Sequence, residues 1–357
     1  MDSVTYSILN NKYLFAIYTL TSPAAGTVRL TAHIARTVFY DLWMNCKEEK
    51  KHNEQLKRNF KQILLGLVEL VFLAGPCAVF FYAKTQKKTP LNPISKTLAD
   101  FGNSRISGQI NGVYITTNET NLSATRQFLK NHPRSNLEKQ TIHIGCATWH
   151  NFDVMCERKS NYGLITDFNP ENAKFIKKTI DIINASESRD LFKQNMIVYL
   201  NSLKGKSRNL FFHQDQKGLP TSRIEDELLR EGSWLQTEEN YLFIKKLAAN
   251  GSLIAITEDI TNFEKFSSIR NFLDKNNIAI DTVYLSNICN FMDTDTKKNS
   301  FAKSIKLLLR DDTILINCPK LKQLDTNQVT ILHQKSILGK EVLANSYDTK
   351  KLFEEII

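Results

Sequence analysis

The chain has few cysteines and lacks the short motifs that identify the common hydrolases and nucleotidases. Its six cysteines form no Cys-x-x-Cys pair and no regular spacing, which argues against a disulfide scaffold or a structural zinc site and favours a reducing compartment. No Gly-x-Ser-x-Gly turn is present, so the nucleophile turn of the α/β hydrolases is excluded. Residues 205–207 (GKS) resemble the end of a phosphate-binding loop, but the glycine required five residues earlier is missing.

Acidic residues are outnumbered by basic ones, and unevenly so. The 357 residues contain 47 Lys and Arg against 37 Asp and Glu, and residues 1–100 hold 13 basic against 7 acidic side chains. The excess is therefore concentrated around the most apolar stretch of the chain, which favours an anionic lipid surface as a partner. No basic stripe with interleaved aromatic residues occurs, which argues against nucleic acid as a partner.

One long apolar run, residues 63–83, contains a single charged side chain. Its 21 residues are enough for a helix to cross a bilayer. Gly75 and Pro76 near its middle would kink or break such a helix, so a re-entrant hairpin is one alternative and a buried core helix another. Residues 28–45 have apolar side chains at helical spacing, typical of an amphipathic helix. We therefore expect residues 1–83 to form a helical, membrane-associating region.

Beyond this region the pattern of the sequence changes. Residues 84–108 are polar and rich in turn-forming residues, and we interpret them as a linker. Residues 109–357 alternate between strand-like and helix-like segments, which predicts an α/β fold: a Rossmann-like, doubly wound, mostly parallel sheet. Residues 201–250 interrupt the alternation as a largely helical insertion, typical of a lid. The expected strands are 112–117, 141–146, 162–167, 196–200, 252–257, 282–285, 313–317 and 329–333, and the expected helices are 122–131, 170–185, 262–275 and 300–309.

Two neighbouring strands of this pattern end at residues suited to a nucleotide pocket. The first ends with Gly145 and Cys146, and the next ends at Asp167. Glycine lets the backbone approach a ligand closely, and an acid about 20 residues further on can hydrogen-bond ribose hydroxyls. Parallel strands end at the same edge of a sheet, so Gly145 and Cys146 would lie near Asp167 and Asn169. The alternative is that Gly145 only eases a turn while Asp167 and Asn169 cap the following helix.

Polar side chains directly follow two further strands. Ser286 and Asn287 come after one of them, where a hydroxyl and an amide could orient a substrate or cofactor. Glu258 and Asp259 come after another and could meet a hydrogen-bond donor of the ligand. Helix capping is the alternative role for all four residues.

A metal site is not expected from this sequence. His143, Cys146, His150 and Cys156 lie close together along the chain. In an extended strand, however, His143 and Cys146 point to opposite faces, and the spacing of the four is not that of structural zinc sites. We therefore predict no bound metal.

Four segments follow one another in the α/β part of the sequence: residues 141–147 (TIHIGCA), 164–167 (LITD), 281–287 (DTVYLSN) and 307–316 (LLLRDDTILI). Taken in this order, they resemble the sequential motifs of class I S-adenosylmethionine-dependent methyltransferases. The resemblance covers about residues 140–335. The stretch 163–173 (GLITDFNPENA) is also similar to a bacterial methyltransferase-like group without an assigned activity.

This resemblance implies a cofactor and a set of roles. In the family the first strand leads to a glycine loop that faces the methionine part of S-adenosylmethionine, an acid at the end of the second strand holds the ribose, and a polar motif follows the fourth strand. Ser286 and Asn287 would accordingly border the methyl donor as catalytic residues. The residues implied in cofactor binding are Gly145, Cys146, Asp167, Asn169 and Asp259.

The glycine loop departs from the family pattern, and the sequence therefore leaves two functional hypotheses. Gly145 is the single glycine of its loop, with Ala147 and Trp149 in place of the others, and His143 stands where an acid is usual. The leading hypothesis is a membrane-associated methyltransferase with its α/β domain in the cytosol and an unidentified methyl acceptor. The alternative is a non-catalytic, membrane-anchored interaction protein, such as a secreted bacterial effector, that keeps the fold without the cofactor. Trp149 filling the cofactor space would favour this alternative.

Overall fold

The computed structural model describes residues 92–102, 113–117, 119–134, 138–203, 210–211, 220–322 and 329–356. The expected membrane-associating region, including residues 63–83, lies outside these residues, as does the GKS sequence at 205–207. Within the described ranges, none of the helices has the length and apolar character needed to cross a membrane.

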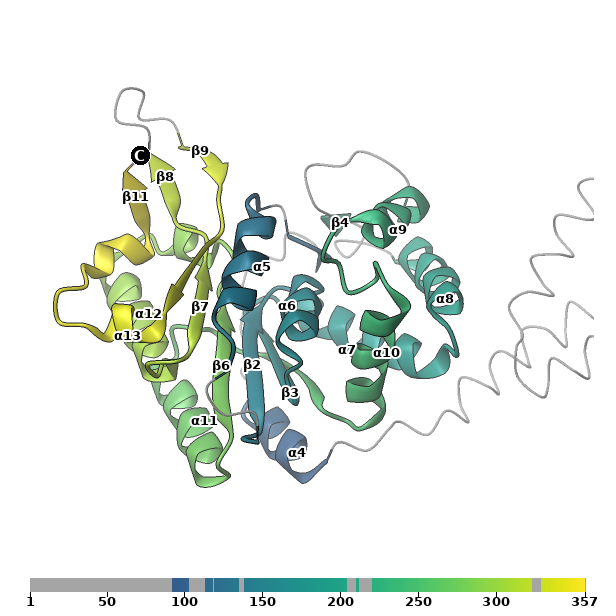
Figure 1. Ribbon diagram of the computed structural model, residues 1–357, viewed down its shortest axis with the longest axis horizontal. Helices are drawn as coiled ribbons and strands as arrows, with labels where there is room; N and C mark the ends of the chain where they lie inside the picture. Colours follow the sequence, from purple (N-terminus) through teal and green to yellow (C-terminus); the bar gives the residue numbers. More distant parts are fainter. Residues whose placement is uncertain are drawn as a thin grey trace, which may run out of the picture. The chain divides into compact units, whose positions relative to one another are not determined.

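The described chain alternates between helices and strands for most of its length (Figure 1). Its helices are α4 (Pro93–Asp100), α5 (Leu122–Asn131), α6 (His150–Arg158), α7 (Pro170–Ala185), α8 (Arg189–Ser202), α9 (Pro220–Leu229), α10 (Glu238–Ala249), α11 (Phe263–Lys275), η3 (Ile288–Phe291), α12 (Asp295–Leu308), α13 (Gly339–Leu343) and η4 (Thr349–Leu352). Its strands are β1 (Val113–Tyr114), β2 (Thr141–Cys146), β3 (Tyr162–Asp167), β4 (Leu210–Phe211), β5 (Leu253–Thr257), β6 (Ala279–Tyr284), β7 (Ile314–Asn317), β8 (Lys320–Lys322), β9 (Val329–Leu332), β10 (Lys335–Leu338) and β11 (Glu354–Ile356).

A six-stranded sheet forms the centre of the fold, with the strand order β10-β7-β6-β2-β3-β5. All neighbours pair in parallel except β10, which runs antiparallel to β7. Ile144 of β2 lies opposite Leu164 of β3 on one side and Val283 of β6 on the other. The expectation of a mixed α/β fold with a mostly parallel sheet is thus confirmed.

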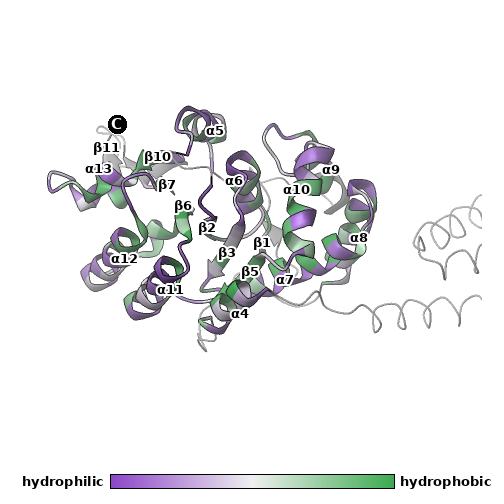
Figure 2. Ribbon diagram, turned by 60° about the horizontal axis from the view of Figure 1, so that its bottom comes forward, coloured by the Kyte–Doolittle hydropathy of each residue, from purple (hydrophilic) through white to green (hydrophobic). Residues whose placement is uncertain are grey.

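Helices cover both faces of this sheet, as Figure 2 shows. Successive residues of a strand point to opposite faces, and the neighbours Ile165 and Leu164 accordingly belong to different cores. Ile165 packs with Phe175 of α7 in a core that also includes α6, α8 and α10. Leu164 packs with Phe301 of α12 in a core that also includes α4 and α11. Because both faces are covered, the central strands consist of nearly continuous apolar runs.

Local sequence signals explain where several of these elements begin. Asn169 caps α7 by accepting a hydrogen bond from the Glu171 N–H, and Pro170 occupies the first position of the helix, where its missing N–H is harmless. Asn262 caps α11 in the same way through the Lys265 N–H. The boundaries expected for the helix at 170–185 and for the strands at 141–146 and 162–167 are confirmed.

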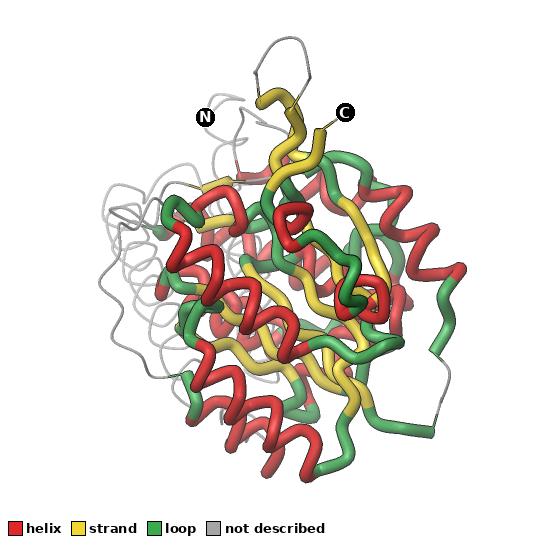
Figure 3. The backbone as a smooth tube through the Cα atoms, turned by 90° about the vertical axis from the view of Figure 1, so that its left-hand side faces the viewer, coloured by secondary structure: helices red, strands yellow, loops and turns green. Residues whose placement is uncertain are grey.

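A second, three-stranded sheet of order β11-β8-β9 follows the end of β7 (Figures 1 and 3). The expected strand at 329–333 is confirmed as β9, but it pairs antiparallel with β8 and lies outside the central sheet. Its continuation brings His333 beside Thr120, and so places the C-terminal part of the domain next to the segment that precedes α5.

Two parts of the chain differ from the sequence-based expectation. The strand expected at 196–200 is wrong, because these residues belong to helix α8. Phe192, Met196 and Leu200 recur every four residues and are the buried positions of that helix. Residues 93–100, within the stretch interpreted as a linker, form helix α4, and its Leu98 is fully buried against the central sheet.

Candidate functional site

The order of the central strands reverses at β2. From β2 the chain moves through β3 to β5 at one edge of the sheet, then crosses back to β6 and β7 on the other side of β2. In open α/β sheets, ligands bind beyond the carboxyl ends of the strands at such a switch point. We call the residues that follow β2, β3, β5 and β6 the carboxyl rim; they are Ala147–Trp149, Phe168–Asn169, Glu258–Asp259 and Leu285–Asn287.

Asp167 is the last residue of β3, and its carboxylate is hydrogen-bonded to two loops of the carboxyl rim, the loop after β2 and the loop after β3. Its Oδ2 accepts hydrogen bonds from the Ala147 N–H and from Asn172 Nδ2, both at 3.0 Å, and its Oδ1 accepts one from the Asn169 N–H at 2.7 Å. Burial raises the pKa of Asp167, while these three donors oppose the shift. An ionised carboxylate can accept about four hydrogen bonds, so Asp167 retains capacity for a ligand hydroxyl.

Gly145 is needed for packing inside the protein. A Cβ atom at this position would lie 1.8 Å from Asn151 Oδ1 and 2.8 Å from His143 Nε2. Asn151 Oδ1 uses the space to accept a hydrogen bond from His143 Nε2 at 2.9 Å, and Asn151 Nδ2 donates to the carbonyls of Cys146 and Thr148. The side chain of Asn151 therefore occupies the place in front of Gly145.

Two residues of the rim have left-handed backbone conformations that L-residues rarely adopt. Ala147 after β2 has φ 64° and Ser286 after β6 has φ 53°. Since β2 and β6 are neighbours, these residues lie on adjacent loops at the switch point. Backbone strain of this kind costs about 1–3 kcal/mol for each residue and concentrates at functional sites.

Ser286 contacts a buried carboxylate from a distant part of the chain. Its hydroxyl donates to Glu119 Oε1 at 2.6 Å, and the Tyr284 hydroxyl donates to the same oxygen at 3.1 Å. Gln334 Nε2 donates to the other oxygen, Glu119 Oε2, at 2.6 Å. Glu119 is fully buried, and these three donors balance the cost of burying its carboxylate.

The polar contacts continue from Gln334 into helix α6. Gln334 Nε2 lies 2.9 Å from His150 Nε2, and His150 Nδ1 lies 2.8 Å from Asp153 Oδ2. Arg230 donates to the same oxygen at 2.6 Å and holds the pKa of Asp153 low against the effect of burial. We call Ser286, Glu119, Gln334, His150, Asp153 and Arg230 the buried polar chain; it connects the switch point with the loop after α9.

Most of the buried polar chain was missed from the sequence. Glu119 lies in a short polar segment before α5, and Gln334 lies between two strands near the end of the domain. Neither residue belongs to a recognisable motif, because their contacts with Ser286 and His150 bridge more than 160 positions. The sequence signals in the buried polar chain are Ser286, which follows a strand, and His150, which lies close along the sequence to His143 and Cys146.

The other expected site residues also reach the rim. The thiol of Cys146 is buried at the end of β2, which raises its pKa, and the charges of Asp167 and Asp259 raise it further. Asp259 uses its Oδ1 to accept from the N–H and hydroxyl of Thr261, both at 2.8 Å. Asn287 follows Ser286 directly and precedes η3. Asn169 caps α7, as its alternative role predicted.

Trp149 does not lie where the interaction-protein hypothesis would place it. Its indole is fully buried on the α7 side of the sheet, with Phe175, Phe192 and Trp234 within 6.1 Å between ring centres. Its Nε1 donates to Thr179 at 3.2 Å. Trp149 is therefore a core residue, and Asn151 is the side chain that fills the space beside Gly145.

Two cavities lined by described residues lie away from the Asp167 side of the rim. The cavity of about 430 Å³ opens at the amino edge of the sheet, beside Thr141 and Asp281. A cavity of about 30 Å³, the size of one water molecule, adjoins His150 and Arg230 of the buried polar chain. The expectation of no metal concerns the whole chain; within the described part, no three His, Cys, Asp or Glu side chains are grouped to hold an ion.

A comparison with known protein families identifies the family of this chain. Residues 114–335 match the family described as Domain of unknown function (DUF7790). The chain belongs to this family. The matched residues run from β1 to the first residue of β10 and thus include the carboxyl rim and the whole buried polar chain. None of the curated proteins matches the sequence.

Proposed function

We propose that this DUF7790 protein binds S-adenosylmethionine at the carboxyl rim and is a methyltransferase with a Rossmann-like fold. The observation that carries the proposal is the position of Asp167 beside the Ala147 loop at the strand-order reversal. This is the relationship expected between a ribose-binding acid and the loop that approaches the rest of the cofactor.

Residues beside Asp167 suit the adenosine part of the cofactor. Phe168 follows Asp167 directly and is 42% exposed, although it is a large apolar side chain. An exposed aromatic ring can stack on a base, and an adjacent carboxylate can hold the ribose hydroxyls. Asp259, whose charge acts on the same thiol as that of Asp167, would border the adenine from the end of β5.

The opposite side of the rim suits the acceptor. S-adenosylmethionine supplies an electrophilic methyl group when bound. Ser286 lies on the loop next to the Ala147 loop, and its hydroxyl already donates to Glu119. A proton released by an acceptor could pass to the Ser286 oxygen as its own proton moves to Glu119. Asn287 would orient the acceptor, and positioning of this kind is the main contribution of such enzymes.

The proposed location is a membrane surface. The basis is the apolar run 63–83 with its excess of basic residues in the first hundred positions. A chain anchored there would present its α/β domain to the cytosol, where the free thiols Cys146, Cys156 and Cys318 would stay reduced.

One observation favours the second candidate, a non-catalytic interaction protein. Asn151 fills the space in front of Gly145, and its amide is held by three hydrogen bonds. In this candidate the fold is kept and the rim is closed by the protein's own side chains. The two candidates differ in whether the rim takes up the cofactor.

Ultraviolet crosslinking of radiolabelled S-adenosylmethionine to the full-length protein, followed by peptide mapping, tests the proposed position. The label is expected in the peptide that contains Phe168, and Phe168→Ala is expected to abolish it. Leu229→Ala serves as the matched control, because Leu229 is a large apolar side chain on α9 that is 80% exposed and is not one of the carboxyl-rim residues. Label in another peptide, or equal labelling of both variants, would contradict the proposal.

A further inference from the structure

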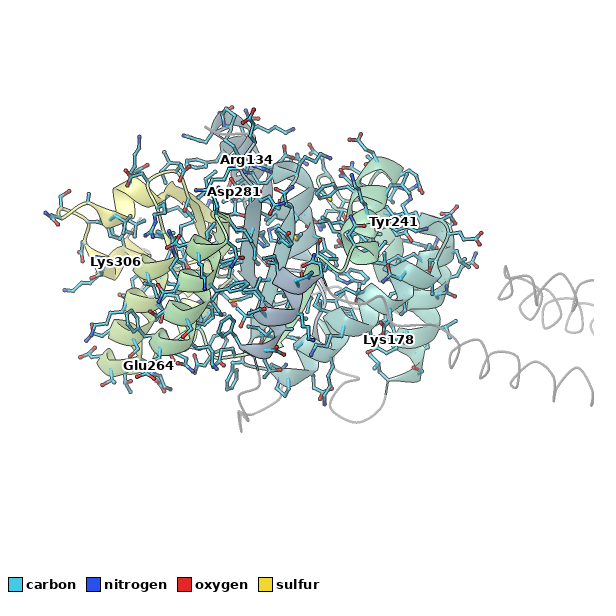
Figure 4. The ribbon with its side chains drawn as sticks, turned by 90° about the horizontal axis from the view of Figure 1, so that it is seen from below. Arg134, Lys178, Tyr241, Glu264, Asp281 and Lys306 are labelled. Atoms are coloured by element: carbon cyan, nitrogen blue, oxygen red, sulfur yellow. The ribbon has the colours of Figure 1, made fainter. Side chains whose placement is uncertain are left out.

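A cavity bounded by described residues lies at the edge of the sheet opposite to the carboxyl rim. It measures about 430 Å³ and is bounded by the first residues of β2 and β6, Thr141 and Ala279, and by the end of α5 at His132. Figure 4, which views the molecule from below, shows Arg134 and Asp281 next to each other in this region. Small-molecule sites commonly have volumes of about 300–1,000 Å³.

The floor of this cavity is a buried ion pair. Arg158 donates from Nε to Asp281 Oδ2 at 2.8 Å and from one terminal nitrogen to Oδ1 at 2.5 Å. Its other terminal nitrogen donates to the carbonyls of Leu129 and His132 at the end of α5. Arg158 therefore makes four hydrogen bonds to protein acceptors and neutralises the charge of Asp281.

Arg134 stands beside this pair as a second guanidinium. Its Nε lies 3.7 Å from Asp281 Oδ1, which is beyond hydrogen-bond distance, and its side chain is only 13% exposed. Burial lowers the pKa of Arg134, and the neighbouring Arg158 lowers it further, while Asp281 opposes both effects. Two guanidiniums thus share one carboxylate, and the floor of the cavity carries an excess positive charge that is poorly hydrated.

The mouth of the cavity does not cancel this excess. Asp311 and Asp312 lie on one side, and Lys139 and Lys340 also line the cavity. The two negative charges of the acids cancel the two positive charges of the lysines. The net charge of the cavity is therefore the single positive charge that remains among Arg134, Arg158 and Asp281 on its floor.

We propose that this cavity binds a small phosphate-bearing anion, with the Arg134 guanidinium as its principal donor. The guanidinium offers several N–H groups in a planar fork that matches phosphate oxygens. A bound anion would neutralise the excess positive charge that Arg134, Arg158 and Asp281 carry together. It would also accept hydrogen bonds from the Arg134 guanidinium in place of water, which burial largely excludes. This site is separate from the carboxyl rim, so the inference does not depend on cofactor binding there.

Isothermal titration of the full-length protein with inorganic pyrophosphate, at constant ionic strength set with sodium chloride, tests this inference. We expect one site per chain and about tenfold weaker binding for Arg134→Gln, since a charge-assisted hydrogen bond is lost. Lys178→Gln removes the same charge far from the cavity, over the ring of Tyr199, and is expected to bind like the unaltered protein. Absence of binding to the unaltered protein, or equal binding by Arg134→Gln, would overturn the inference.

Substitutions of two exposed residues at the mouth of the cavity provide a second test, which applies even if Arg134→Gln does not fold. Lys340→Gln is expected to weaken pyrophosphate binding about twofold to threefold, and Asp311→Asn is expected to strengthen it by a similar factor. Both residues are exposed, so neither change should disturb folding. Opposite shifts support an electrostatic site in this cavity, whereas two unchanged affinities would refute it.

Discussion

The hydroxyl of Ser286 donates a 2.6 Å hydrogen bond to the fully buried carboxylate of Glu119. The two residues are 167 positions apart, and the contact joins the loop after β6 to the segment before α5. Glu119 accepts from Tyr284 and Gln334 as well. One carboxylate therefore holds together three parts of the chain that meet at the switch point.

Replacement of Glu119 by glutamine is expected to destabilise the protein by about 1–3 kcal/mol. The amide nitrogen of the new side chain would face a donor, either Gln334 Nε2 or one of the two hydroxyls. Urea unfolding measures the loss. Glu341→Gln, a change of the same type at an exposed position, should stay within about 0.5 kcal/mol. Equal stability of the two variants would show that the buried polar chain contributes nothing to folding.

Gly145→Ala is expected to lower stability by about 1–3 kcal/mol, because the new methyl group would overlap Asn151 Oδ1. The double variant Gly145→Ala, Asn151→Ala should lose less than the sum of the two single changes, since truncating Asn151 opens the space. A double-mutant cycle in urea measures this coupling. Strict additivity would mean that the two side chains do not compete for the same place.

Acidification should destabilise the protein through His143. Burial lowers the pKa of this histidine from 6.5 to about 4, with hydrogen bonds to Asn151 and Thr282 in place of water. The contribution of neutral His143 to the free energy of unfolding is fully present above pH 6.5, the pKa of histidine in the unfolded chain. This contribution is lost as the pH falls toward the folded-state pKa of about 4. The maximum effect is about 3 kcal/mol.

Comparison with His143→Gln isolates this contribution from that of the carboxyl groups that titrate in the same range. The difference in unfolding free energy between the unaltered protein and His143→Gln should shrink between pH 7 and pH 4.5. A difference that stays constant over this range would show that His143 does not titrate on unfolding.

Removal of one partner from the Arg158–Asp281 pair is expected to be more damaging than removal of both. Arg158→Met leaves a buried carboxylate with only Arg134 nearby and should cost about 3–5 kcal/mol. The double variant Arg158→Met, Asp281→Leu should recover a large part of this loss. Thermal melting of the two variants makes the comparison, and a double variant less stable than the single one would contradict it.

The elements of the central sheet could be predicted because their signals are local. β2, β3 and α7 have the boundaries expected from apolar runs and from the Asn169–Pro170 cap. Residues 196–200 were misjudged because a short apolar run fits a strand as well as a helix. The additional buried positions at Phe192 and Leu200, four residues to each side of Met196, decide in favour of α8.

The candidate site was predictable only in part, for a physical reason. Asp167 ends β3 and Ser286 closely follows β6, and any parallel sheet brings the carboxyl ends of its strands to one rim. Glu119 and Gln334 reach the same rim through tertiary packing, which local patterns do not encode. The role of Gly145 was likewise hidden, because it depends on the position of the Asn151 side chain.

The most direct test of the central claim is isothermal titration of the full-length protein with S-adenosylmethionine. The account predicts one site per chain and at least tenfold weaker binding for Asp167→Asn, because the carboxylate that would hold the ribose is lost. Asp295→Asn, an exposed position in the first turn of α12, should bind like the unaltered protein. No binding by the folded, unaltered protein, or equal binding by Asp167→Asn, would contradict the account.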